Sequence, residues 1–238
     1  MSQVINTNVS SLFAAAALNK SANALQVAQQ RLSSGLRINS SKDDATGMSI
    51  AAGYDKDIRG ANMYIRNANN AISTAQTSDG YLGQILENTQ RLREIFIQTS
   101  SITGAEAVQL IAENGRIDGL VTATGTITVD ASSGSVTGSG VAFTAATTFA
   151  NLAAFDTEIT AVITARSKFG ADMAALSSAV STLQTSVVNL SAAYSRVMDT
   201  DYATETMNMT RNQILQQAGI AALAQSNQNP SMVLSLLR

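Results

Sequence analysis

The strongest constraint on the fold of this chain is a series of apolar residues that runs from Phe169 to Val197 in alternating steps of four and three. This spacing places every member on one stripe of an α-helix and is typical of coiled-coil packing. A helix over this range is about 45 Å long. We predict that it packs against another long helix of the same chain, with an ordinary bundle helix as the alternative. The series is Phe169, Met173, Leu176, Val180, Leu183, Val187, Leu190, Tyr194 and Val197.

A second long helix is predicted from Asp44 to Thr99, where Asp43 and Asp44 suit a helix N-terminus. Its apolar positions recur first in steps of seven and then in steps of three and four. Between the two patterns, residues 78–80 (Ser-Asp-Gly) predict an irregularity. The positions are Ile58, Ile65, Ile72, Leu82, Ile85, Thr89, Leu92, Phe96 and Thr99.

Both ends of the chain also have helical patterns. One helix is predicted from about Asn8 to Ser34, with Gly35 as its C-terminal residue, and another covers 201–238. Pro230 predicts a break in the last helix, because the residue before a proline avoids helical geometry. A weaker helix covers 105–120. The apolar residues at the two ends are Leu18, Leu25, Leu32, Ile214, Leu215, Ala218, Ala221, Ala222, Val233, Leu234, Leu236 and Leu237.

The middle of the chain has a different composition. Residues 121–148 are rich in Gly, Thr, Ser and Val, and the run Thr126–Val129 has the composition of a strand. With a turn at Ser133-Gly134, this pattern predicts a β-hairpin, with 141–143 as a third extended piece. A disordered linker is the alternative.

The composition argues against most kinds of enzyme. The 238 residues contain no Cys and no His, which removes the thiol nucleophile and the commonest general base and metal ligand. Pairs of acidic residues fit helix caps and solvated faces, and no phosphate-binding lysine motif is present. The net charge of −2 excludes a strongly basic nucleic-acid binder. We therefore expect no catalytic residue, no metal and no cofactor.

The chain contains no apolar run long enough to span a membrane. Residues 12–18 have the composition of a short signal-peptide core, but no Lys or Arg precedes them. We expect a helix at this place rather than a secretory signal, and no membrane partner.

Motifs at both ends of the chain resemble those of bacterial flagellin. Near the start they are residues 4–9 (VINTNV), 31–39 (RLSSGLRIN) and 42–47 (KDDATG). Near the end they are 195–203 (SRVMDTDYA), 213–219 (QILQQAG), 223–228 (LAQSNQ) and 233–237 (VLSLL). Their order and their distance from the ends agree with that family over about residues 1–100 and 165–238.

The resemblance implies a mainly α fold, in which long antiparallel helices from both chain ends form a coiled-coil-like rod with a small β-hairpin region in the middle. Residues 1–43 and 200–238 would form an inner core domain, with a linker at about 35–43. Residues 44–199 would form a helical rod domain with a variable segment at about 121–150. The short middle implies a minimal flagellin that lacks outer domains.

The resemblance also implies a function. Flagellins are exported through the flagellar type III channel and polymerise outside the cell into the filament that drives motility. The implied partners are copies of the same chain, a cap protein, hook-junction proteins and an export chaperone. Subunit packing is expected at Leu18, Leu25, Leu32, Val233, Leu234, Leu236 and Leu237.

A second implied surface lies on the rod. Residues 90–95 resemble the stretch of flagellins that an innate immune Toll-like receptor recognises, with Gln90, Arg91, Arg93, Glu94 and Ile95 as its members. The flank of a solvated helix explains the same residues without a receptor.

Three other functions compete with the filament subunit. A hook–filament junction protein shares the rod pattern, but the motif at 233–237 favours flagellin. A metalloprotease inserted in the variable region would need histidines that the chain lacks. A secreted coiled-coil adhesin would need a binding pocket or an aromatic cluster, and neither is evident in the sequence.

Overall fold

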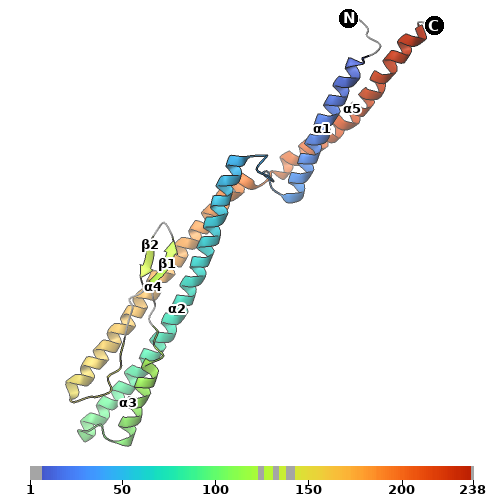
Figure 1. Cartoon of the computed structure of the whole chain (residues 1–238). Helices are drawn as coiled ribbons and strands as arrows, with labels where there is room; N and C mark the ends of the chain where they lie inside the picture. Colours follow the sequence, from blue (N-terminus) through green and yellow to red (C-terminus); the bar gives the residue numbers. More distant parts are fainter. Residues whose placement is uncertain (1–6, 123–125, 131–133, 138–142, 237–238) are drawn as a thin grey trace. The chain divides into compact units, whose positions relative to one another are not determined.

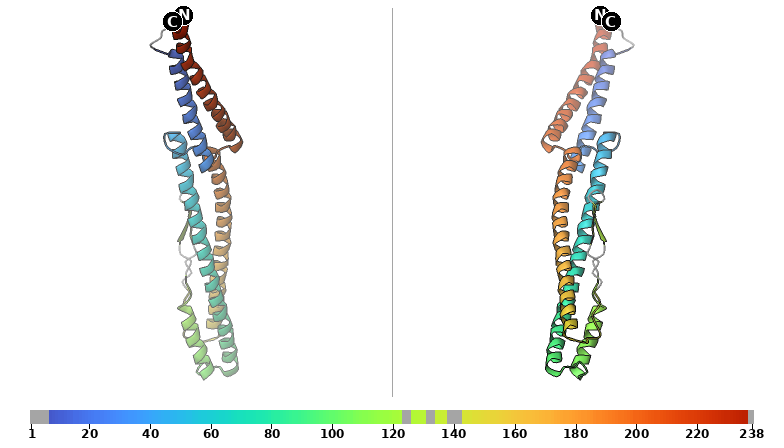
Figure 2. Two further views of the ribbon diagram at one scale, coloured as in Figure 1. Left: turned by 90° about the vertical axis from the view of Figure 1, so that its right-hand side faces the viewer. Right: turned by 90° about the vertical axis from the view of Figure 1, so that its left-hand side faces the viewer.

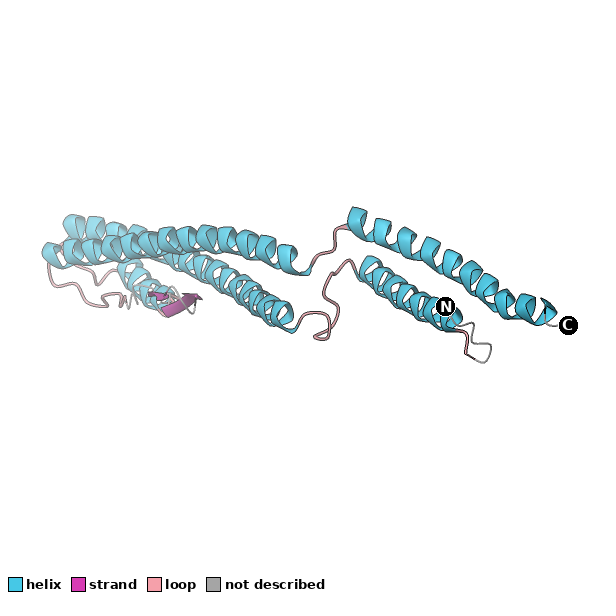
Figure 3. Cartoon of the chain, turned by 90° about the horizontal axis from the view of Figure 1, so that it is seen from above, coloured by secondary structure: helices cyan, strands magenta, loops and turns pink. Residues whose placement is uncertain are grey.

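A computed structural model describes the backbone of residues 7–122, 126–130, 134–137 and 143–236, and the side chains of 7–122 and 143–228. This part of the chain is mainly α-helical, as predicted (Figures 1 and 3). In chain order the elements are α1 (Val9–Ser34), α2 (Ala45–Thr99), α3 (Ala105–Asp118), β1 (Thr126–Asp130), β2 (Gly134–Thr137), α4 (Leu152–Met198) and α5 (Tyr202–Leu236).

The first two helix boundaries follow the local sequence. Asn8 caps α1, because its Oδ1 accepts the backbone N–H of Ser11 at 3.1 Å. Gly35 ends the helix in the left-handed conformation, with φ of 73°. Asp44 caps α2 by accepting the N–H of Gly47 at 2.9 Å. Asp43 belongs to the loop instead, where the N–H groups of Asn39 and Ser40 lower the pKa of its carboxyl.

The chain divides into two compact units, one of residues 56–191 and one of residues 1–55 and 192–238. In the 56–191 unit, α4 packs along α2, which confirms the predicted pairing of the two long helices. Leu183 and Val187 contact Ala61 and Ile65. Farther along, Phe169 lies in one cluster with Ala75, Leu82, Ile85, Ile117, Val162 and Ala165.

The heptad series of α4 faces inward throughout, since each of its nine positions is buried or half-buried. On α2 the isoleucines at 58, 65 and 72 are half-buried, whereas Ala61, Ala68 and Ala75 are 6%, 0% and 0% exposed. Small residues thus occupy the deepest positions of this part of α2.

Helix α4 begins at Leu152, well before the start of the predicted series. Positions 155, 158, 162 and 165 continue its steps of three and four up to Phe169, and all of them are buried. Two of these positions hold Glu158 and Ala165, which obscured the apolar pattern in the sequence. The segment between α3 and α4 therefore covers residues 119–151.

The predicted irregularity at residues 78–80 is wrong, because α2 continues through them. The polar side chains are bonded to neighbouring segments instead of breaking the helix. The Ser78 hydroxyl donates to the carbonyl of Thr122 at 2.9 Å, and Arg166 of α4 binds both carboxylate oxygens of Asp79 at 2.8 and 3.2 Å.

Strands β1 and β2 pair antiparallel, with Thr126 opposite Thr137 and an irregularity between Thr128 and Asp130. Figure 3 shows them as the magenta pair beside the helices. Ser133 and residues 141 and 142 of the predicted turn and third strand lie outside the described residues. Phe143 lies in a loop and packs against the core.

In the unit of residues 1–55 and 192–238, α1 and α5 run side by side (Figure 2). The two connecting segments of this unit are hydrogen-bonded to each other. Arg37 N donates to Met198 O at 2.6 Å, and Thr200 N donates to Gly35 O at 2.9 Å. Ile38, Ala51 and Met198 form a small core beside this ladder.

The predicted break at Pro230 is also wrong, since α5 continues to Leu236. A proline in a helix leaves the carbonyl four residues earlier, here that of Ser226, without its usual N–H donor. The side-chain amide of Asn8 donates to this carbonyl at 2.8 Å. A donor from α1 therefore replaces the missing one in α5.

Candidate subunit interface

The face of α1 that lies against α5 combines small and large residues. Ser21 and Ala28 are buried there, and the predicted Leu18, Leu25 and Leu32 are half-buried around them. The helices approach closely at Gly219 of α5, where a Cβ atom would lie 3.4 Å from Leu18 Cδ1 and 3.7 Å from Leu18 Cβ. The three leucines thus contribute to pairing within the chain while part of each stays exposed.

The covered side of α5 is largely polar, although Met209 and Leu223 are half-buried as well. Glu205 and Ser226 are buried, Asn212 and Gln216 are half-buried, and Arg31 of α1 lies 3.8 Å from Glu205. Next to this pair, the Tyr202 hydroxyl donates to Leu32 O at 3.0 Å. Hydrogen bonds and ion pairs therefore align α5 with α1.

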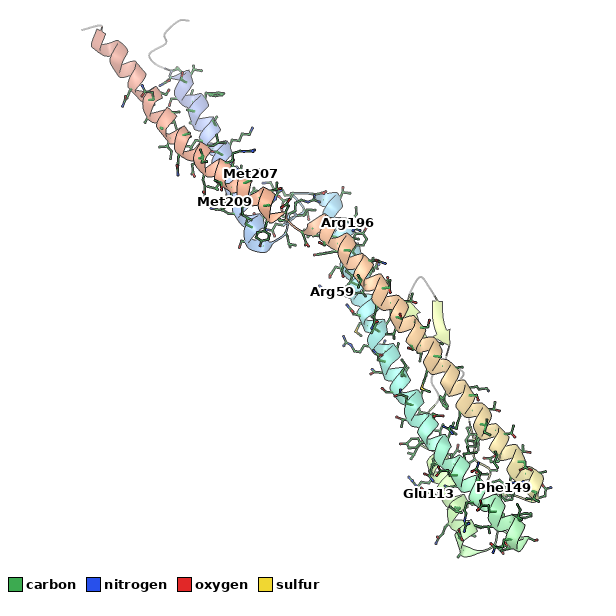
Figure 4. The ribbon with its side chains drawn as sticks, turned by 180° about the vertical axis from the view of Figure 1, so that it is seen from behind. Arg59, Glu113, Phe149, Arg196, Met207 and Met209 are labelled. Atoms are coloured by element: carbon green, nitrogen blue, oxygen red, sulfur yellow. The ribbon has the colours of Figure 1, made fainter. Side chains whose placement is uncertain are left out.

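Several large apolar residues of α5 remain exposed. Met207 and Ile214 lie on the side away from α1, whereas Leu215 borders the α1 contact and lines a pocket with Leu18 and Gly219. Met207, Ile214, Leu215 and Ile220 are each more than half exposed, and Met207 is labelled on α5 in Figure 4. A shallow groove runs along the side of Met207 and Ile214, lined by Ala203, Thr206, Met207, Thr210, Arg211, Ile214 and Leu215. On α1 the exposed apolar residues are Val9, Leu12 and Phe13, of which Phe13 is 78% exposed.

Val233, Leu234 and Leu236 lie on the last turns of α5, whose backbone is described but whose side chains are not. Leu237 lies outside the described residues. The predicted packing role of these four residues stays a prediction.

The predicted receptor residues lie near the C-terminal end of α2. Two of them form ion pairs with α3 and α4. Leu92 is fully buried, Ile95 packs on the same cluster, and Gln90 is exposed. Arg91 Nε lies 2.9 Å from Glu106 of α3 and its Nη1 lies 3.2 Å from Glu94, whereas Arg93 Nε lies 2.8 Å from Asp156 of α4. The two arginines therefore have structural partners on either side of the buried leucine.

A buried polar network lies close to this stretch. Gln84 donates to Asn88, Asn88 donates to Asn114 of α3 at 2.8 Å, and Asn114 donates to Thr89 at 3.3 Å. Thr89 completes the series by donating to the carbonyl of Ile85. Every member is hydrogen-bonded, so the network holds α3 on α2 in a defined register.

Two acidic residues that the sequence analysis did not single out hold the segment before α4. Glu158 accepts the N–H of Ala146 at 3.1 Å, and Asp118 accepts that of Ala145. Burial raises the pKa of both carboxyls, and the nearby Asp118 carboxylate raises the pKa of Glu158 further. Asp118 lies at the C-terminal end of α3, where a negative charge is unfavourable. This position was the signal in the sequence that could have identified it.

This segment covers an aromatic cluster. Phe149, labelled in Figure 4, stacks on Phe155 of α4 with ring centroids 4.2 Å apart. Phe96 of α2 lies 5.5 Å from Phe155 on the other side. The rings fill the end of the 56–191 unit, where α2, α3 and α4 meet.

The described residues contain no cluster of acidic side chains that could hold a metal ion. Among the described helices, none combines the length and hydrophobicity that crossing a membrane requires.

Comparison with known proteins places these features in a family. The bacterial flagellin N-terminal helical region matches residues 5–133, and the bacterial flagellin C-terminal helical region matches residues 152–237. The second match begins at the first residue of α4.

Similar flagellins, two of them over nearly the whole chain, agree with these matches. Flagellin of Xenorhabdus nematophila is 36% identical, with 100% of both chains covered. Flagellin of Halalkalibacterium halodurans is 35% identical over 99% of this chain and 100% of its own. Flagellin of Salmonella typhimurium is 47% identical over 128 residues, which is 50% of this chain and 26% of that relative. The chain therefore belongs to the bacterial flagellin family and is a structural subunit of the extracellular flagellar filament, not an enzyme.

Proposed function

We propose that the paired chain ends, α1 with α5, are the inner core through which this subunit polymerises, and that α2, α3 and α4 form a coiled-coil-like rod with the β1–β2 hairpin. Under this proposal the inner core domain comprises residues 1–43 and 200–238. The rod domain comprises residues 44–199. Polymerisation with copies of itself is the property of the family.

The observation that supports this role is the orientation of α5. Polar residues such as Glu205 and Asn212 are covered on the α1 side, while Ile214 on the opposite side is 59% exposed. A helix that faced only its own chain would gain more free energy by burying the apolar side. Neighbouring subunits would cover the exposed residues, together with the free parts of Leu18, Leu25 and Leu32.

A substitution on this outer side tests the proposal. Ile214→Asp places a charge where a neighbouring subunit would pack, so we expect little sedimentable filament after seeding with salt, as seen by electron microscopy. Ile214→Met keeps the apolar area and should assemble normally. Since Ile214 is exposed in the single chain, circular dichroism of the soluble protein should be unchanged. Normal filaments from Ile214→Asp would contradict the proposal.

The same apolar side is available for an export chaperone before assembly, and the cap and hook-junction proteins would meet the subunit at the filament ends. These partners are proposals from the family. In a pull-down with the cognate chaperone, Ile214→Asp should reduce binding relative to Ile214→Met.

Recognition by a Toll-like receptor is a second candidate role of the α2 surface. Gln90, Arg91 and Glu94 are exposed there. Because Arg91 and Arg93 are paired with acidic residues of α3 and α4, a receptor would have to compete with those pairs. A reporter-cell assay that compares Arg91→Ala with Lys20→Ala, a substitution on α1, tests this role.

A further inference from the structure

The single proline of this chain leaves one carbonyl without its helical donor. In an α-helix the N–H of residue i donates to the carbonyl of residue i−4, and Pro230 has no N–H. The carbonyl affected is that of Ser226, a residue that is only 8% exposed. Water therefore has limited access to this oxygen, and an unmet bond here is costly.

Both halves of the Asn8 side-chain amide are used. Its Nδ2 donates to Ser226 O at 2.8 Å, across 218 residues of sequence, and its Oδ1 accepts the N–H of Ser11 at 3.1 Å. One side chain thus begins α1 and supplies the bond that Pro230 removes from α5.

Two directional contacts lie at the opposite end of this helix pair, where the Tyr202 hydroxyl donates to Leu32 O and Arg31 lies 3.8 Å from Glu205. Toward the chain ends, the contacts other than that of Asn8 are less selective. The packing of Leu18 over Gly219 is apolar and without direction, and the Ser11 hydroxyl meets Asn227 Oδ1 in an exposed position. A shift of α5 by one turn would offer Asn8 a carbonyl that already has a helical donor, and it would leave Ser226 O without one. Because of Asn8 and Pro230, every other register of the two helices loses a hydrogen bond and is less stable.

We propose that Asn8 is a positioning residue that fixes the register of α1 against α5 near the chain ends, by donating to the one carbonyl that Pro230 frees. This inference rests on the proposed core pairing of the chain ends and adds the residue that aligns them. It assigns Pro230 a role as well, since the proline creates the acceptor that Asn8 recognises.

Engineered disulfides report the register directly, because the 238-residue sequence contains no cysteine. A Leu18→Cys/Gly219→Cys pair reports the observed register, since the built Cβ of residue 219 lies 3.7 Å from Leu18 Cβ, close to the disulfide average of about 3.8 Å. A Leu18→Cys/Leu223→Cys pair reports a shift of one turn. Denaturing gels separate cross-links within a chain from those between subunits.

The variant Asn8→Asp separates the two functions of the side chain. Aspartate keeps the oxygen that caps Ser11 and places a favourable negative charge at the helix N-terminus, but it cannot donate to Ser226. We expect the ratio of shifted to observed cross-link to rise about tenfold, the effect of losing one partly buried hydrogen bond. Ser11→Ala removes only the exposed contact between the helices and should leave the ratio within about twofold.

Pro230→Ala provides the rescue. It restores a backbone N–H for the Ser226 carbonyl, so Asn8→Asp should then change the ratio by about twofold or less. The proposal would be overturned if Asn8→Asp left the cross-link ratio unchanged. It would also be overturned if Asn8→Asp raised the ratio equally in the chain with Pro230 and in the Pro230→Ala variant. Either result would leave the assembly test at Ile214 unaffected, so the two proposals fail separately.

Discussion

At the scale of single residues, polar side chains occupy several positions that the helical spacing reserves for apolar ones. Glu158 continues the heptad series of α4, and Asn88, Thr89 and Asn114 lie at the contact of α2 with α3. Each is hydrogen-bonded, so each favours one arrangement of its neighbours over others. Glu158 is the member that can also respond to pH.

The pH dependence of Glu158 follows from its burial. Burial and the Asp118 carboxylate raise its pKa above the ordinary 4.5, so the folded chain holds the proton more tightly than the unfolded chain. The free energy of unfolding should therefore fall as the pH rises above about 4.5. Glu158→Gln keeps an oxygen for the Ala146 N–H without a charge. We expect a higher melting temperature than wild type at pH 7 and a smaller difference between pH 4.5 and pH 7.

Glu113 is the matched control, since a hydrogen bond from Arg116 lowers the pKa of its carboxyl (Figure 4 labels Glu113). Its contribution to stability has the opposite sign and is lost as the pH falls through its lowered pKa. Glu113→Gln should not raise the melting temperature at pH 7. If thermal unfolding of Glu158→Gln showed the wild-type pH dependence, the inferred role of the buried carboxyl would be wrong.

At the scale of elements, the contact between α2 and α4 is the main core of the 56–191 unit. Its clusters combine alanines of α2 with larger residues of α4. Apolar burial along this contact supplies stability that isolated helices lack.

The substitution Leu183→Asp tests this contact. Leu183 is 7% exposed and packs on Ala61, so an aspartate there would bury a charge without a partner. We expect a loss of about 3 kcal/mol or more in the free energy of unfolding, measured by circular dichroism in urea. Val188→Asp, on the same helix but at a residue 66% exposed, should cost about 0.5 kcal/mol or less. Equal stability of the two variants would refute the pairing.

At the scale of the whole molecule, assembly is expected to complete the folding of the chain ends. The seam of α1 is formed by half-buried leucines around Ser21 and Ala28, and that of α5 is largely polar. Ordering each residue costs about 1–2 kcal/mol of backbone entropy, and small side chains return little of it on burial.

Deleting residues 230–238 should therefore abolish or strongly weaken polymerisation, while the thermal transition of the 56–191 unit stays unchanged. Brief proteolysis of the monomer should cut within α1 and α5 and spare α2 to α4, whereas filaments should protect all five helices. Equal protection of α1 and α5 in monomer and filament would show that their folding is not coupled to assembly.

The middle segment is expected to face outward in the filament. It lies outside the helical seams, and β2 begins at Gly134. A short epitope inserted after Gly134 should permit assembly and bind antibody along the whole filament, as seen by immunogold microscopy. Labelling confined to the filament ends would contradict this orientation.

The sequence by itself determined the helices and their inward faces. Apolar spacing identified α4 from Phe169 onward. Gly35 marked the end of α1, and the acidic pair Asp43 and Asp44 marked the start of α2. These features depend on residues close together in the chain, so local patterns reveal them. The end motifs also identified the family that the comparisons established.

Only the tertiary structure decided the features that depend on distant partners. The continuity of α2 at residues 78–80 and of α5 at Pro230 depends on bonds to Thr122, Arg166 and Asn8, which are far away in sequence. The early start of α4 was hidden because Glu158 occupies a seam position, and its bond to Ala146 became visible only in the fold. Local propensity describes a segment alone, whereas these segments are stabilised by hydrogen bonds that another segment donates or accepts.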